Sequence, residues 1–138
     1  MPLPAKLEAI VDDFAAAPEE LRKELLLEMS DELPPLPEGM DSSSMEQVTE
    51  CQSPFFLATD VAPDGTVRMW FDAPPQAPTT RGFAGILAQG LDGAKAEEIL
   101  AVEDDFHQRM NLASLISPLR MRGMSAILAR LKRQVRQS

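Results

Sequence analysis

The sequence predicts an α+β fold in which helices pack on one face of a small three-stranded antiparallel sheet. Three observations predict it: apolar residues recur at helical spacing near both ends of the chain, they alternate with polar residues in the middle, and Pro-rich connectors separate these regions. With 138 residues, 44% of them hydrophobic, the chain is long enough for one domain over 1–138 and short for two.

Residues 1–33 predict a pair of helices. An apolar stripe at positions i, i+3, i+4 and i+7 marks the first helix: Leu7, Ile10, Val11 and Phe14. The helix should end before Pro18, which together with the acidic pair that follows suits the start of a second helix. Apolar residues then recur every four positions, predicting the buried face of a helix that ends at Pro34–Pro35: Leu21, Leu25, Met29 and Leu33.

Residues 45–72 predict the three-stranded sheet. The runs 55–61 and 66–72 are joined by a Pro-Asp-Gly turn and form a hairpin, because apolar and polar residues alternate in the second run. Residues 45–50 can supply a third antiparallel strand. This arrangement would leave Cys51 in the turn between the first two strands.

Residues 79–138 predict helices. One begins near Pro78–Thr79, and Gly82 and Gly85 allow another helix to approach it closely. Shorter helical pieces are expected at 93–101 and 104–116. Ser117 followed by a proline is a strong signal for the start of a long last helix. Its buried stripe consists of Met124, Ile127, Leu128, Leu131 and Val135.

Composition excludes several classes of function. A net charge of −9 argues against nucleic acid as the main partner. No apolar run is long enough for a membrane span, and MPLPAKLEAI lacks the apolar region of a signal peptide, so a cytoplasmic protein is expected. One cysteine and one histidine cannot build a disulfide or a protein-only metal or iron–sulfur site, and no phosphate-binding motif is present. We therefore expect no bound metal and no bound nucleotide.

Charge is distributed unevenly along the chain. Acidic residues dominate 1–50, while 120–138 holds six basic residues and no acidic one. The simpler interpretation is that these are solvated surfaces that attract each other within the fold. The alternative is a docking surface for a protein of opposite charge.

Cys51 is either a structural or a chemical thiol. Free cysteines are among the most buried residue types, which favours an inert thiol. Its polar, turn-prone neighbours favour a thiol that other molecules can reach. Glu50 would raise the pKa of this thiol, whereas Arg120 or Arg122 would lower it if the fold brings them close. A self-contained Cys–His hydrolase is not expected, because His107 lies in a helical stretch with no orienting motif.

Several segments together resemble the SufE family, the sulfur acceptors that partner cysteine desulfurases in iron–sulfur cluster assembly. These segments are MEQVTECQSPFFL with the hairpin after it, APTTRGFAGIL, and SPLRMRGMSAILARLKRQVR. The specific part is V-x-x-C-x-S before an apolar strand, combined with P-x-R-x-x-G at the start of the last helix. The likeness covers nearly the whole chain.

The resemblance implies the fold that SufE shares with iron–sulfur scaffold proteins, and a persulfide carried on Cys51 with support from Arg120. It implies a sulfur-transfer accessory protein rather than a free-standing enzyme, with no cofactor of its own. The implied partners are a SufS-like cysteine desulfurase, which is a pyridoxal phosphate enzyme, and a downstream cluster scaffold. This chain departs from the family pattern at two positions. Many members have glycine directly before the cysteine, where this chain has Glu50, and many have an acidic residue near the position that Gln76 occupies here.

Two functions from different classes therefore stand side by side. In the first, the chain is a sulfur carrier whose Cys51 side chain rests in an apolar hollow near the sheet edge and moves out with its loop on docking. In the second, the chain is a non-catalytic protein-binding adaptor in which Cys51 only packs. A cluster scaffold is not expected, because such proteins use about three or four ligands per cluster and one thiol is available.

Overall fold

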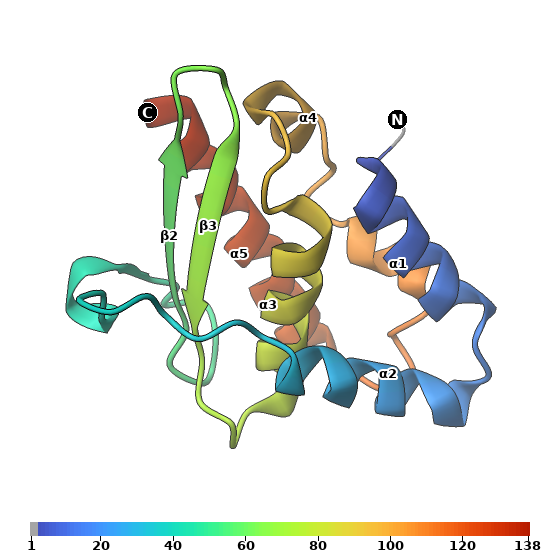
Figure 1. Cartoon of the computed structure of the whole chain (residues 1–138). Coiled ribbons are helices and arrows are strands. Elements are labelled where there is room, and N and C mark those ends of the chain that lie inside the picture. The colour runs from blue at the N-terminus through green and yellow to red at the C-terminus, as the bar shows by residue number, and fades with distance from the viewer. Residues whose placement is uncertain (1–2) are drawn as a thin grey trace.

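The computed structural model describes residues 3–138, so residues 1 and 2 of the predicted domain lie outside the described residues. The elements are α1 (Ala5–Ala16), α2 (Glu19–Asp31), η1 (Ser42–Ser44), β1 (Glu46–Gln47), β2 (Phe56–Val61), β3 (Val67–Asp72), α3 (Pro78–Leu91), α4 (Ala96–Leu100), η2 (Phe106–Met110) and α5 (Pro118–Gln137). The predicted α+β class is confirmed: the chain forms a three-stranded antiparallel sheet of order β1-β2-β3. Figure 1 shows β2 and β3 beside the helices.

The hairpin of β2 and β3 is the main part of the sheet. Six residue pairs join the two strands, and Gly65 supplies the positive φ of +89° that the connecting turn requires. The inward side chains of β3 are buried as the alternation predicts: Val67, Met69 and Phe71. Phe71 also packs against Phe55, the buried residue just before β2. The apolar face of the hairpin is therefore turned towards the helices.

Strand β1 is much shorter than the predicted strand over 45–50. It pairs with β2 only at Glu46 and Gln47. The backbone N–H of Val48 still donates to the carbonyl of Phe55, at 2.8 Å, but the N–H of Cys51 then donates back to the carbonyl of Val48, at 3.2 Å. The chain turns at this point, so the remaining residues cannot continue the ladder.

The predicted buried face of α2 is wrong in part. Leu21 is exposed, and the residues buried within the helix are Leu26 and Ser30. Apolar residues four apart drift by about 40° at each step around an α-helix, so Leu21 and Leu33 do not share one face. The helix also ends at Asp31, earlier than the prolines predict.

Helix α3 is the centre of the helical layer and touches α1, α2, α5 and β3. The predicted close approach at Gly82 and Gly85 is confirmed. A Cβ at Gly85 would overlap the backbone carbonyl oxygen of Met29, and a Cβ at Gly82 would lie 2.6 Å from that of Leu26. At Gly85 the two helices meet backbone to backbone, and at Gly82 the side chain of Leu26 also packs against the glycine. The position of α3 therefore sets the contact face of α2.

Helix α5 closes the fold. Ser117 Oγ accepts a hydrogen bond from the backbone N–H of Arg120 at 3.3 Å, which confirms the predicted start of the helix. All members of the predicted stripe are buried: Met124, Ile127, Leu128, Leu131 and Val135. This stripe packs α5 against β2, α3 and α4, so α5 crosses the back of the sheet (Figure 1).

The segment between α3 and α5 is less helical than predicted. Of the expected pieces at 93–101 and 104–116, only α4 and the 3-10 helix η2 form. Asn111 ends η2 in the left-handed conformation, with φ 57°. Over residues 3–138, every helix is too short or too polar to cross a lipid bilayer.

We predict that Gly85→Ala lowers the free energy of unfolding by about 1–3 kcal/mol, because backbone atoms of Met29 occupy the space that the new Cβ needs. This is the net loss that remains after the gain of about 1 kcal/mol in helix propensity. Urea unfolding followed by circular dichroism measures the change. Gln89→Ala on the same helix removes only an exposed hydrogen bond to Glu32 and should change stability by about 0.5 kcal/mol or less. Equal stability of Gly85→Ala and the parent protein would contradict the backbone contact.

Candidate functional site

Cys51 lies in the turn between β1 and β2, where the sequence places it. Its side chain is half buried against α5, with Sγ 3.9 Å from the carbonyl oxygen of Gly123. Gly123 is the glycine of the P-x-R-x-x-G segment. Because it has no side chain, the sulfur reaches the helix backbone: a Cβ on Gly123 would lie 3.4 Å from Sγ. The thiol therefore rests on the helix and is sheltered from solvent in part.

The surroundings of Cys51 favour the neutral thiol. Partial burial raises the pKa of Cys51 to about 11, the neighbouring carboxylate of Glu50 contributes to this rise, and the positive charge of Arg130 opposes it to a smaller extent. Glu50 thus acts on the thiol as expected from the sequence. At pH 7 the thiol is therefore almost entirely protonated in this conformation. A thiol in this state is a poor nucleophile.

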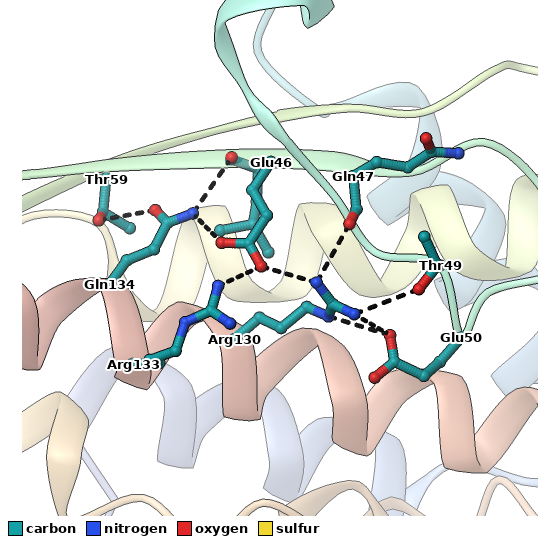
Figure 2. Close-up of polar contacts among 9 residues, drawn as sticks. Glu46, Gln47, Thr49, Glu50, Thr59, Arg130, Arg133 and Gln134 are labelled. Atoms are coloured by element: carbon teal, nitrogen blue, oxygen red, sulfur yellow. Dashed lines mark hydrogen bonds and ion pairs between the residues drawn. The ribbon is translucent and has the colours of Figure 1, made fainter.

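Arg130 of α5 binds the segment that leads into Cys51 (Figure 2). Its guanidinium donates to Glu50 Oε1 from Nε at 2.9 Å and from Nη2 at 2.7 Å, and to Thr49 Oγ1 at 3.2 Å. It also donates from Nη1 to Glu46 Oε2 at 2.7 Å and to the carbonyl of Gln47 at 3.2 Å. We call these contacts to residues 46–50 the Arg130 clamp.

Glu46 is the second hub of this network. Besides the bond from Arg130, it accepts hydrogen bonds from Arg133 and from Gln134 Nε2, the latter at 2.9 Å, and Gln134 in turn accepts a hydrogen bond from Thr59 on β2 (Figure 2). Burial alone would raise the pKa of Glu46, but the three donors together outweigh it and lower the pKa to about 2. Acidic residues of the first third thus meet basic residues of the last helix within the fold, as the simpler interpretation of the charge distribution expects.

Arg120, the other predicted site residue, lies in the first turn of α5 and is exposed. Its Nη1 is 3.5 Å from Thr79 Oγ1 at the start of α3. It lines a hollow beside the Cys51 turn, together with Ser53, Pro54 and Gln76. The positive charge that acts on the pKa of Cys51 belongs to Arg130 instead. The sequence carries one signal for this: Arg130 is seven residues after Gly123, so both lie on one face of the helix.

His107 is buried apart from this network. Its ring packs edge-on against Phe83 and Phe106, and burial lowers its pKa, opposed by the charge of Asp105. Its Nδ1 has no hydrogen-bond partner among residues 3–138. The groups that act on the pKa of Cys51 are Glu50 and Arg130. The described part of the chain also holds no group of three or more His, Cys, Asp or Glu residues placed to bind a metal ion.

The chain is similar to known proteins over nearly its whole length. Residues 8–135 match the family model of SufE, described as an Fe-S metabolism associated domain. Two uncharacterized SufE-like proteins of Mycobacterium tuberculosis, from strains CDC 1551 and H37Rv, are each 54% identical over 136 residues, covering 99% of this chain and 95% of theirs. The solution structure of a hypothetical protein from Thermus thermophilus has a TM-score of 0.87 and 42% identity, covering 99% of this chain and 97% of that one.

We predict that the alkylation rate of Cys51 in the isolated protein rises with pH towards a midpoint of about 11, since burial and Glu50 hold the thiol protonated. Glu50→Gln removes one of these causes and should move the midpoint to lower pH. Iodoacetamide labelling at a series of pH values, followed by intact mass, measures both. A midpoint at the ordinary value near ~8.5 would mean that the thiol is not sheltered as described.

We further predict that the Glu46 network makes folding stability depend on acid pH. The pKa of Glu46 is lower in the folded protein than in the unfolded chain, so its contribution is complete above about pH 4.5 and is lost as pH falls towards 2. Glu46→Gln should lose stability at pH 7 and be less sensitive to pH over that window. Urea unfolding at several pH values tests this. Glu38→Gln, at an exposed glutamate, is the control, and an equal effect of both variants would refute the prediction.

Proposed function

Since the chain belongs to the SufE family, we propose that it accepts persulfide sulfur on Cys51 from a pyridoxal phosphate-dependent cysteine desulfurase, stimulates that enzyme, and passes the sulfur to iron–sulfur cluster assembly in the cytoplasm. The observation that carries the proposal is the position of the lone thiol, held in a surface turn and resting on the backbone of Gly123. The association of the family with Fe-S metabolism supports the same role.

The transfer is a thiol exchange between two proteins. The desulfurase carries a persulfide on its own cysteine, and the thiolate of Cys51 attacks the outer sulfur of that persulfide. The new S–S bond forms on Cys51 while the old one breaks, and the desulfurase cysteine leaves as a thiolate that takes up the proton Cys51 has lost. No external oxidant or reductant is consumed, because one thiol and one persulfide simply exchange places.

We infer that the Cys51 turn moves before this attack. With a pKa of about 11 and a half-buried sulfur, the thiol in contact with Gly123 is partly sheltered from solvent and reacts slowly with alkylating or oxidising reagents. Moving away from α5 removes the burial that contributes most to the raised pKa. The free protein would therefore keep its thiol inert until the turn is drawn into the active site of the desulfurase.

We assign Arg120 a supporting role in the displaced state. Its guanidinium borders the hollow that also includes Ser53 and Pro54, the residues directly after the Cys51 turn. A persulfide carries negative charge more readily than a thiol, and an arginine forms charge-assisted hydrogen bonds with such an anion. The exposure of Arg120 leaves it available to the displaced Cys51 or to the partner's persulfide.

One observation favours the alternative, a protein-binding adaptor in which Cys51 is structural. The raised pKa and the packing of Sγ on α5 are also what an inert thiol would show. In that case Cys51→Ser would leave binding and any stimulation of a desulfurase unchanged. The reactivity of the Cys51 sulfur therefore distinguishes the two functions.

We predict that incubation with a cysteine desulfurase and cysteine adds the mass of one sulfur atom to this chain, and that a reductant removes it. Intact-mass spectrometry measures the gain, and peptide mapping should place it on Cys51. The matched control is Cys51→Ser, which should show no gain and should abolish stimulation of the desulfurase. A parent protein that binds the desulfurase yet never gains sulfur would support the adaptor function and contradict the sulfur-carrier function.

A further inference from the structure

We propose that Arg130 is a positioning residue that controls how often the Cys51 turn leaves α5. The proposal rests on the sulfur-acceptor function, because only a thiol that must move needs its release controlled. The Arg130 clamp holds the segment before the thiol, and Gly123 receives the sulfur itself. Arg130 acts on Cys51 through the loop and takes no part in the bond changes.

The contacts of Arg130 are concentrated on one short segment. The guanidinium reaches two side chains directly before Cys51, those of Thr49 and Glu50, as well as Glu46 and the backbone of Gln47 (Figure 2). Release of Arg130 therefore frees Thr49 and Glu50, which lie between the buried Val48 and Cys51. On the other side of the turn, Phe55 is fully buried and stays attached to the core. The mobile part is confined between these two anchors.

The two contacts of the turn with α5 lie on the same face of that helix. Gly123 and Arg130 are seven residues apart, which is about two helical turns. The sulfur contact is weak, at 3.9 Å to a carbonyl oxygen, whereas the clamp contains two charged pairs. The clamp is therefore the stronger of the two attachments and determines the resting position of Cys51.

The clamp is also exposed enough to open without unfolding. The Arg130 side chain is 23% exposed and that of Glu50 is 49% exposed, so water and salt weaken their attraction. A buried pair would fix the turn permanently. This partly exposed pair holds the turn closed while allowing a docking protein to compete for either charge.

The test is Arg130→Gln, with the alkylation rate of Cys51 measured on the isolated chain at neutral pH. We expect alkylation about five- to thirty-fold faster, because loss of the clamp raises the fraction of molecules with the turn displaced. The direction is diagnostic. The charge of Arg130 lowers the pKa of Cys51, so its loss without movement of the turn would raise that pKa and slow alkylation. Faster alkylation of a variant that stays folded therefore indicates release of the turn.

Two further variants separate positioning from a general structural role. Arg133→Gln removes the same charge from the same helix and one partner of Glu46, but leaves the bonds from Arg130 to Thr49 and Glu50, so its alkylation rate should stay within about twofold of the parent. Arg130→Lys keeps the charge without the planar fork and should give an intermediate rate. Urea unfolding of each variant shows whether the fold is retained.

Amide hydrogen exchange gives a readout that does not depend on thiol chemistry. In Arg130→Gln, peptides covering 48–53 should exchange faster, while those covering 67–72 in β3 should be unchanged. Unchanged or slower alkylation together with unchanged exchange at 48–53 would overturn the proposal, as would equal acceleration in Arg133→Gln. None of these measurements uses a desulfurase, so failure of sulfur transfer and failure of the clamp remain distinguishable.

Discussion

The contact between α5 and the segment 46–51 is the interaction on which the properties of the thiol depend. The buried stripe of α5 fixes the helix across the sheet, and this places Gly123 under the sulfur and Arg130 beside the residues that precede it. If α5 were displaced, Cys51 would lose the burial that most raises its pKa. The hydrophobic packing of α5 against the sheet thus contributes to the raised pKa of the Cys51 thiol.

The charges of the chain take part in the same contact. A strongly acidic protein would gain little from acidic residues placed next to a thiol, because they disfavour the thiolate. Here Arg130 is paired with Glu46 and Glu50, and Arg133 is paired with Glu46 alone, so the negative charge beside Cys51 is partly neutralised. The pairs with Arg130 also hold the turn in place. Glu50 gains a role as a partner of Arg130 in this way.

Much of the fold follows from local sequence signals, but the site does so only in part. Periodicity and turn residues predict the hairpin, the stripe of α5 and the turn that holds Cys51, because each depends on neighbours in the chain. The buried face of α2 depends on glycines in α3, and the clamp joins residues 80 positions apart, so neither is visible locally. Arg120 is identified through the family motif, and its role stays a prediction. Arg130 lies outside that motif.

The brevity of β1 has a mechanical consequence. Two residue pairs attach it to β2, whereas six pairs join β2 to β3. The sheet is in effect a two-stranded ribbon with a short third strand at its edge, and Cys51 follows that short strand. The Cys51 turn can therefore move without disturbing the packing of the hydrophobic core. Selection could accordingly adjust the reactivity of the sulfur and the thermodynamic robustness of the molecule as independent traits.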